Sequence, residues 1–220
     1  MNSQLINIII LAAVALFLVL RLRNVLGTRD GYEAPVKPAA KTSPKVKRKF
    51  DVIDGGGEDL DIADHVDVNS DSGKALAAMK RIEPAFSVGE FAHGARQAYE
   101  MILMAFEKGD LDFLQQYLAP DVYESFAGAV NARNEKGLTV DANFVGVREL
   151  KVHDAKFDEE NREAEITMKF VGELTSVVKD SDGRIVEGDP DTIKRQSDVW
   201  TFARLMGGEN PNWLLVGTGE

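Results

Sequence analysis

The pattern of apolar and polar positions divides the chain into an apolar start, a polar stretch and a second half with helix and strand periodicity. The apolar start runs from Leu5 to Leu20 without a charge. At about 1.5 Å per residue, a helix over this run is about 24 Å long. Leu22 and snorkelling arginines extend it towards a bilayer core of about 30 Å. The pattern predicts a membrane anchor over residues 1–22, held by Leu5, Ile10, Leu16, Leu20, Arg21 and Arg23.

The charges that flank the apolar run indicate an uncleaved anchor and its orientation. A cleaved signal peptide needs basic residues before the apolar stretch and a small-residue cleavage site after it. Met1 to Gln4 carry no basic side chain, whereas Arg21, Arg23 and Arg29 follow the run. By the positive-inside rule, we expect the amino terminus outside and the rest of the chain inside.

A polar stretch over residues 23–72 reads as a disordered linker that is first basic and then acidic. Prolines interrupt its basic part, and its acidic part has too few apolar residues to fold alone. As a random chain it would reach about 40 Å. The basic cluster consists of Lys45, Lys47, Arg48 and Lys49. These side chains are candidates for contact with anionic lipid headgroups. An equal alternative is that they stay in water and only set the orientation of the anchor in the membrane.

Two motif-like strings in the acidic part lack the residues that their chemistry needs. Gly55–Gly57 is not followed by the Gly-Lys-Ser/Thr of a phosphate loop. Asp67, Asn69 and Asp71 have the spacing that begins a calcium loop, but Ala78 stands where a bidentate glutamate is required. We therefore expect neither a metal nor a cofactor.

Helix signals dominate the first half of the folded region, which we expect over residues 73–220. A short helix over 74–82 is predicted to stop at Pro84. Ser87 and Glu90 have the spacing of a capping box, and Phe86 and Phe91 flank it as a hydrophobic staple. This start predicts a long helix whose apolar stripe is Phe91, Ala95, Ala98, Tyr99, Ile102, Leu103 and Phe106.

Residues that typically begin or end helices predict where this helix ends and where two shorter helices lie. Gly109 is expected to end the long helix, and Asp110 to cap the next one. Pro120 should begin a third helix, which Gly137 ends.

After Leu138 the pattern changes to strands. The predicted strands are Val145–Ala155, Glu163–Val178, Arg184–Glu187, Ile193–Leu205 and Trp213–Gly217. Asp182-Gly183 is a hairpin turn, and Gly188 to Pro190 are expected to end that hairpin. Helices followed by an antiparallel sheet make an α+β fold, in which a curved sheet wraps the long helix and can leave a pocket.

Composition and charge limit the function classes. The net charge of -10 and a pI near 4.9 argue against nucleic-acid binding. The chain has no cysteine, which excludes disulfides, thiolate metal sites and a thiol nucleophile.

Aromatic side chains are the candidates for a hydrophobic pocket or membrane contact. They are Phe91, Tyr99, Phe106, Trp200 and Trp213. Packing in the core is the alternative interpretation, because aromatics at helical and alternating spacing are usually buried. A lipid-binding module is therefore the second functional hypothesis.

A small acid–base enzyme is the third functional hypothesis, and the sequence offers little for it. Of the three histidines, His65 lies in the predicted linker, His153 near a strand end, and His93 on the solvent side of the long helix. No nucleophile or metal cluster accompanies them, so we expect no catalytic residue. A pocket lined only by apolar side chains would exclude acid–base catalysis.

An ordered set of five segments resembles a known family. The segments are Phe91–Asp110, Asp121–Phe126, Glu187–Asp189, Asp198–Arg204 and Asn210–Leu215. It is the family of the 44-kDa subunit of the mitochondrial inner-membrane translocase, including its bacterial inner-membrane adaptor branch. The resemblance covers about residues 75–220, and the anchor followed by Arg21-Leu22-Arg23 is similar to the short bacterial members.

The resemblance implies a cystatin-like or NTF-like cone of helices on a curved antiparallel sheet, with a hydrophobic pocket. It implies an adaptor in protein translocation or membrane-protein assembly, single-pass in the inner (cell) membrane with its domain in the cytoplasm, and not an enzyme. The expected partners are membrane lipids and protein components of a translocase, insertase or chaperone, with no nucleic acid. The mitochondrial member has a long N-terminal region that recruits a chaperone motor. This chain has only a linker there, so motor recruitment does not carry over.

Overall fold

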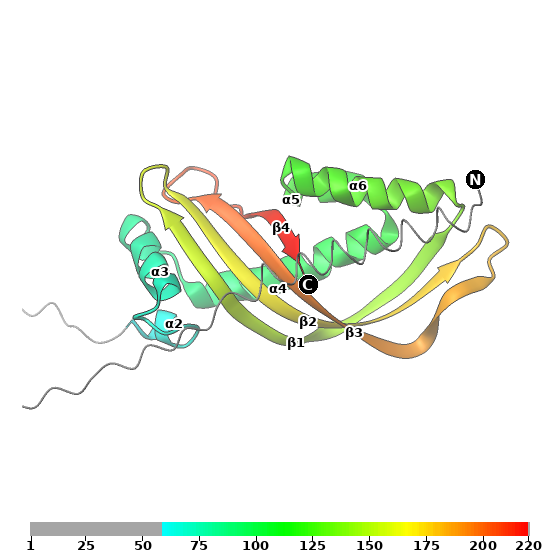
Figure 1. The fold of residues 1–220 in the computed structure, drawn as a ribbon, viewed down its shortest axis with the longest axis horizontal. Coiled ribbons are helices and arrows are strands. Elements are labelled where there is room, and N and C mark those ends of the chain that lie inside the picture. The colour runs from blue at the N-terminus through cyan, green and yellow to red at the C-terminus, as the bar shows by residue number, and fades with distance from the viewer. Residues whose placement is uncertain (1–58, 220) are drawn as a thin grey trace, which may run out of the picture. The chain divides into compact units, whose positions relative to one another are not determined.

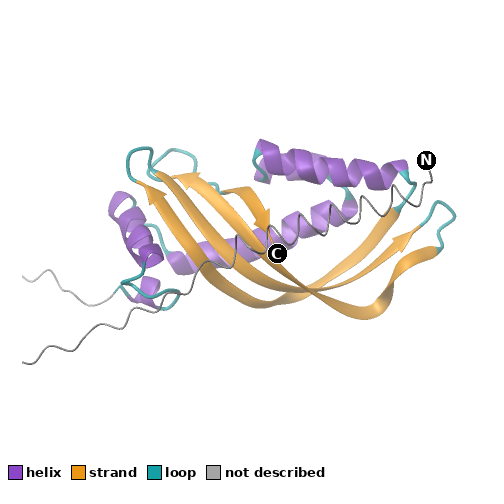
Figure 2. Ribbon diagram, in the orientation of Figure 1, coloured by secondary structure: helices purple, strands orange, loops and turns teal. Residues whose placement is uncertain are grey.

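The computed structural model describes residues 59–219, which fold as helices followed by one sheet (Figure 1, Figure 2). The helices are α2 (Leu60–Ala63), α3 (Asp71–Ile82), α4 (Val88–Lys108), α5 (Leu111–Tyr117) and α6 (Pro120–Glu135). The strands are β1 (Thr139–Asp158), β2 (Glu163–Lys179), β3 (Ile185–Leu205) and β4 (Leu214–Gly219). They pair antiparallel in the order β1-β2-β3-β4. The predicted mixed α+β class with an antiparallel sheet is confirmed.

The start and end of α4 follow the local signals in the sequence. Ser87 is the N-cap, and its hydroxyl accepts a hydrogen bond from the Glu90 N–H at 3.2 Å. The rings of Phe86 and Phe91 lie 6.5 Å apart across this cap. Gly109 ends the helix with a φ of 73°, a left-handed conformation that favours glycine. Each of these features was predicted.

Two shorter helices, α5 and α6, follow α4 in the chain. Asp110 accepts a hydrogen bond from the Phe113 N–H at 3.0 Å and caps α5. Pro120 is the first residue of α6, as predicted. The rings of Phe106 on α4 and Phe126 on α6 pack 5.0 Å apart, so α6 lies against the second half of α4.

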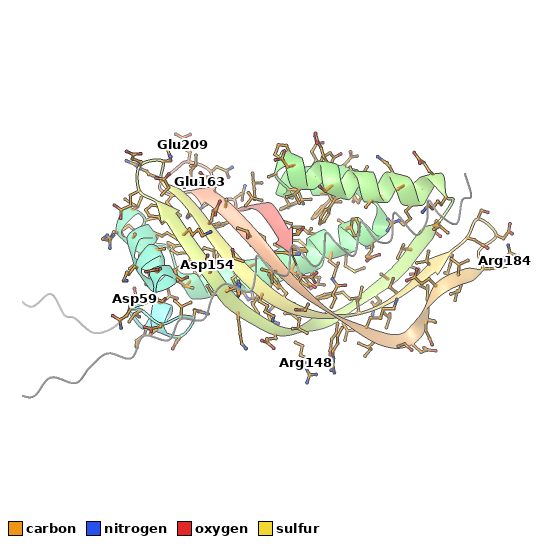
Figure 3. All side chains as sticks on the ribbon, viewed as in Figure 1. Asp59, Arg148, Asp154, Glu163, Arg184 and Glu209 are labelled. Atoms are coloured by element: carbon orange, nitrogen blue, oxygen red, sulfur yellow. The ribbon has the colours of Figure 1, made fainter. Side chains whose placement is uncertain are left out.

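The strands curve around α4, which lies along their concave face (Figure 1). The Tyr99 ring of α4 stacks on Phe170 of β2 with 4.4 Å between centroids and 7° between planes. Ile166, Met168 and Phe202 are fully buried on the same face. On the other face, Arg148 points away from the helices and lies 3.6 Å from Glu173 (Figure 3). The core therefore lies between α4 and one face of the sheet.

β3 differs from the prediction of a hairpin that ends at Gly188 to Pro190. One strand runs from Ile185 to Leu205, so the predicted break is wrong. The pairing with β2 moves from Leu174↔Lys194 to Ser176↔Asp189, so a bulge absorbs the intervening residues of β3. β4 pairs only with residues 199–203 of β3, so Pro190 lies on an open edge, where its missing N–H is tolerated.

The folded region begins earlier than residue 73, the predicted first residue of the domain. α2 lies within the predicted linker, and its Ile62 is only 2% exposed. Ser70 caps α3 by accepting from the Gly73 N–H at 3.0 Å. The burial of Ile62 and the cap formed by Ser70 hold this acidic segment in a defined structure, although its average composition is typical of disorder.

No helix within residues 59–219 is long and apolar enough to cross a membrane. The predicted anchor over residues 1–22 and the basic cluster Lys45, Lys47, Arg48 and Lys49 lie outside the described residues. Both stay predictions from the sequence.

Candidate functional site

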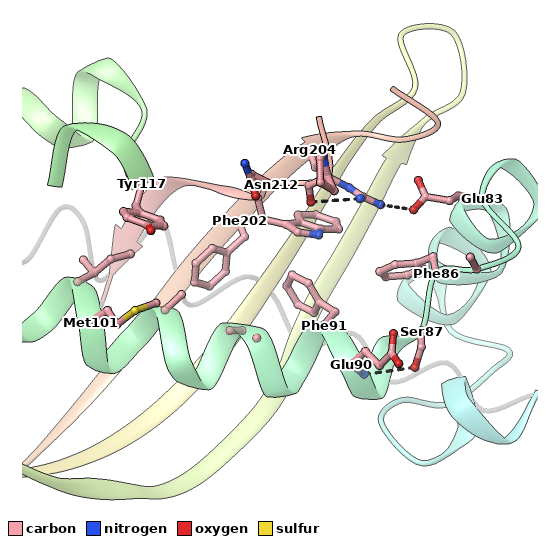
Figure 4. A pocket seen from close by; sticks show the side chains of 17 residues that line it. Glu83, Phe86, Ser87, Glu90, Phe91, Met101, Tyr117, Phe202, Arg204 and Asn212 are labelled. Atoms are coloured by element: carbon pink, nitrogen blue, oxygen red, sulfur yellow. Dashed lines mark hydrogen bonds and ion pairs between the residues drawn. The ribbon is translucent and has the colours of Figure 1, made fainter. Parts of the chain in front are cut away.

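An apolar pocket of about 380 Å³ lies between residues 90–102 of α4, the end of β3 and the turn that leads to β4 (Figure 4). Its apolar walls come from distant parts of the chain and are formed mainly by Phe86, Phe91, Met101, Ile102, Phe202 and Trp213. The pocket therefore exists only when α4 packs on the sheet.

Aromatic rings hold the pocket walls together. The Trp213 ring lies 4.7 Å from the Phe91 ring and 6.1 Å from the Phe86 ring. Phe91 meets Phe202 edge to face at 6.1 Å. Tilted and edge-to-face pairs at these distances are favourable beyond the area that they bury. These walls are thus largely aromatic surfaces packed against one another.

One end of the pocket is polar and centres on Arg204. Its Nη2 donates to Glu83 Oε1 at 2.9 Å, and its Nη1 donates to the Pro211 carbonyl at 3.2 Å. The guanidinium carbon lies 5.1 Å from the centre of the Trp213 ring, in cation–π range. The Arg204 side chain is only 9% exposed, and its Nε has no hydrogen-bond partner among the described residues.

Glu83 is held in its charged form at this end. Burial alone would raise its pKa, but the Gly207 N–H and the Arg204 guanidinium outweigh that effect and lower the pKa. A carboxylate with a lowered pKa is a structural ion-pair partner and is poorly suited to general acid–base work near neutral pH.

The structure separates the five aromatic residues that the sequence proposed for a pocket. Phe91 and Trp213 line it. Tyr99 and Trp200 are buried in the core, at 0% and 4% exposed. Phe106 packs between α4 and α6, with Arg133 5.7 Å from its ring centre.

Sequence reasoning missed Phe202 and Arg204 as pocket residues and treated Phe86 only as part of a helix start. Trp200, Phe202 and Arg204 alternate along β3 and therefore share the face that meets α4. That alternation was the available signal for Phe202 and Arg204. Trp213 follows a turn, and this position in the sequence did not indicate which side chains it contacts.

A second group of polar side chains is partly buried and involves the hydroxyl of Tyr99. Its hydroxyl donates to Asp198 Oδ2 at 2.6 Å, and Gln196 Nε2 donates to the same carboxylate at 2.9 Å. Burial, followed by the Asp198 carboxylate, raises the pKa of Tyr99 above its ordinary value. Asp198 is thus a hydrogen-bond acceptor in this structure.

The histidines lie apart from the pocket. His93 is exposed on α4 and its Nε2 lies 3.2 Å from Gln97 Nε2, while His153 is exposed on β1. Neither they nor His65 line the pocket. Glu83 and Glu90 do line it, so the criterion of a wholly apolar lining is not met. Residues 59–219 contain no group of three or more His, Cys, Asp or Glu placed to hold a metal ion.

Residues 72–220 match the sequence model of the Tim44-like domain. The chain belongs to the Tim44-like domain family. The resemblance noted in the sequence is therefore confirmed.

Curated relatives of this Tim44-like chain are named as subunits of a mitochondrial translocase. The human mitochondrial import inner membrane translocase subunit TIM44 is 27% identical over 146 residues, which is 65% of this chain and 32% of that protein. The rat protein of the same name is 25% identical over the same shares. The Arabidopsis thaliana subunit TIM44-1 is 25% identical over 136 residues, 62% of this chain and 28% of that protein. The match thus spans about a third of the length of these relatives.

Among solved structures, the intermembrane space region of the chloroplast protein ARC6 aligns with 56% of this chain and 94% of its own. The TM-score of 0.37 and the identity of 11% are too low to carry an argument.

Proposed function

We propose that this Tim44-like chain is a membrane-anchored adaptor that binds protein partners in protein translocation or membrane-protein assembly. Membership of the family is the observation that carries the proposal, since the curated relatives are subunits of an import translocase of an inner membrane. Candidate partners are components of a translocase, insertase or chaperone. The chain acts in this proposal by binding and positioning, without an enzymatic activity.

The proposed anchor is the apolar run over residues 1–22, single-pass in the inner membrane, with the Tim44-like domain on the cytoplasmic side. The absence of charge from Leu5 to Leu20 and the arginines after it support this topology. Because α2 (Leu60–Ala63) already belongs to the folded domain, the proposed linker is shortened to residues 23–58. A random chain of that length spans about 33 Å. The domain would then remain near the bilayer at a raised effective concentration for membrane partners.

The adaptor proposal is tested by crosslinking in native membranes, followed by identification of the captured proteins. Three chains are compared: the full-length chain, a chain without residues 1–22, and a chain in which residues 1–22 are replaced by an unrelated membrane helix. Translocase, insertase or chaperone components captured with the first and third chains, but not the second, support a tethered adaptor. Capture of no such component by the full-length chain would refute it.

A lipid-binding module is the second candidate function, and the apolar pocket is the observation that favours it. Its volume of about 380 Å³ and its aromatic walls suit an acyl chain. Native mass spectrometry of the purified full-length chain tests this function. A bound lipid that is lost when Phe91→Asp or Phe202→Asp polarises the pocket would support it, while a lipid retained by both variants would assign the lipid to another surface.

A further inference from the structure

The connection between α3 and α4, residues 83–87, forms one wall of the apolar pocket and is held at both ends by a carboxylate. Glu83, Phe86 and Ser87 all face the pocket. At the first end, Glu83 binds Arg204 at 2.9 Å and accepts from the Gly207 N–H at 3.1 Å. These contacts fix the beginning of the wall to β3 and the turn after it.

The second end is fixed by Asp61, which belongs to α2. Its Oδ1 accepts from the Ser87 hydroxyl and from the Gly89 N–H, each at 2.9 Å. Its Oδ2 accepts from the Val88 N–H at 2.8 Å. The first N–H groups of a helix have no partner within the helix. Asp61 therefore supplies the acceptors that the first turn of α4 lacks.

Residues 59–66, here called the clasp, are seated closely on α3 and α4. The Lys80 ammonium of α3 lies 2.8 Å from both Asp59 Oδ2 and Asp61 Oδ2. Ile62 is 2% exposed and belongs to the same core cluster as Phe86 and Phe91. A Cβ added at Gly89 would lie 3.4 Å from Asp61 Oδ1 and 3.8 Å from His65 Nε2. There is thus little space between the clasp and the first turn of α4.

The position of the clasp in the chain suggests a regulatory role. It precedes residues 72–220, the part that matches the Tim44-like domain, and it is where the N-terminal region joins the domain. α2 has only four residues, so the clasp can open at a lower free energy than the sheet core. We propose that the clasp is a releasable brace: when it is seated, it holds the wall formed by residues 83–87 in place, and when it is released, that wall moves, the pocket widens and its lining becomes more accessible.

This inference goes beyond the adaptor proposal and does not depend on the identity of any partner. It makes the pocket responsive to whatever displaces residues 59–66. A partner that binds the clasp, or tension along the incoming chain, would change access to a pocket formed by other parts of the domain. Reciprocity then requires that filling the open pocket favours release of the clasp.

The first test measures access to the pocket in the full-length chain held in lipid nanodiscs. The chain has no cysteine, so Ala98→Cys introduces a single thiol at a pocket-lining position. The rate of its reaction with N-ethylmaleimide reports access. Adding Asp61→Asn, which removes the charged acceptor at the start of α4, should raise this rate by roughly five- to tenfold, the lower range of typical coupling between sites.

Asp64→Asn is the matched control, because it removes the same charge from the exposed end of the same helix. The Asp64 side chain makes no hydrogen bond among the described residues, so the rate should stay within about twofold of the parent. Equal rates for the Asp61 and Asp64 variants would overturn the brace.

The second test uses the unmodified full-length chain and is independent of any folding defect in a variant. Hydrogen exchange should show that residues 59–66 and 86–91 open together, with the same protection, well before the amides of β2. Opening of the clasp without any opening of residues 86–91 would overturn the coupling. Equal protection of both segments and β2 would overturn release short of global unfolding.

Discussion

The Tyr99 side chain makes both an apolar packing contact and a hydrogen bond. Its ring stacks on Phe170, and its hydroxyl donates to Asp198 at 2.6 Å in a region where Tyr99 is fully buried. Asp198 is partly buried, and a carboxylate that loses water without gaining donors is costly, so the hydroxyl and Gln196 favour Asp198 at this position.

Tyr99→Phe should therefore destabilise the fold although it preserves the ring. The Asp198 carboxylate loses one of its two side-chain donors, and we expect the free energy of unfolding to fall by about 1–3 kcal/mol. Urea unfolding followed by circular dichroism measures this change. Tyr123→Phe is the control, because the Tyr123 hydroxyl makes no hydrogen bond within the described residues and its removal should change stability by less than about 0.5 kcal/mol. Equal effects of the two changes would contradict the role of Asp198.

Gly172 shows that the same tyrosine also restricts its neighbour on β2. A Cβ at Gly172 would lie 2.5 Å from the Tyr99 hydroxyl oxygen and 2.9 Å from its Cε1. Gly172→Ala should destabilise by about 1–3 kcal/mol through overpacking, measured by the same unfolding experiment. Gly146→Ala on β1 is the matched change, because nothing lies within 4 Å of its added Cβ. A Gly172 variant as stable as the Gly146 variant would show that the ring moves aside freely.

At the scale of elements, helix boundaries were predictable and long-range partners were not. Capping and staple residues act within a few positions of each other, so Ser87, Phe86 and Gly109 revealed α4 without knowledge of the fold. By contrast, the pairing of Ser176 with Asp189 across a bulge depends on the register between two strands. Gly188 and Pro190 are typical turn residues, so the sequence indicated the end of a hairpin there and not a continuous strand.

The start of α4 also depends on a residue from another element, and this dependence gives a pH prediction. Burial alone would raise the pKa of Asp61, but Lys80 and the donors at the start of α4 lower it below its ordinary value of 3.8. The folded state thus binds this proton less readily than the unfolded state. The stabilisation is present above about pH 4 and is lost as the pH falls below it.

Comparison of the unmodified chain with Asp61→Asn isolates this contribution. We expect the difference in free energy of unfolding to be about 1–3 kcal/mol at pH 7. The difference should shrink as the pH falls from 4 towards 3, as measured by urea unfolding at each pH. A difference that stays constant over this range would mean that the charge of Asp61 is not what stabilises the first turn of α4.

For the molecule as a whole, the sequence indicated the order of helices and sheet and the existence of a pocket, but only part of its lining. Phe91 and Trp213 line the pocket, while Tyr99 and Trp200 are core residues. The spacing of aromatic residues shows which face of a helix or strand is apolar. It does not show where two packed apolar faces leave a pocket between them. Arg204 was missed because its polar partners, Glu83 and Pro211, come from other segments.

The beginning of the folded region provides the sharpest test at this scale. We compare chains that begin at residues 23, 59 and 73 by urea unfolding. The chain from residue 73 lacks the buried Ile62, worth about 1.5–3 kcal/mol, and the acceptors that Asp61 gives to α4. It should unfold at least about 3 kcal/mol more easily than the chain from residue 59.

The chain from residue 23 is the control for this comparison, since it adds only residues that precede the clasp. Its stability should equal that of the chain from residue 59, and both should be soluble and folded. If the chains from residues 59 and 73 were equally stable, the clasp would contribute no net stability, and the domain would begin where the family match begins, at about residue 72. A less stable chain from residue 73 would instead make residues 59–72, which include the clasp and the Ser70 cap of α3, an integral part of this Tim44-like domain, although residues 59–71 lie outside that match.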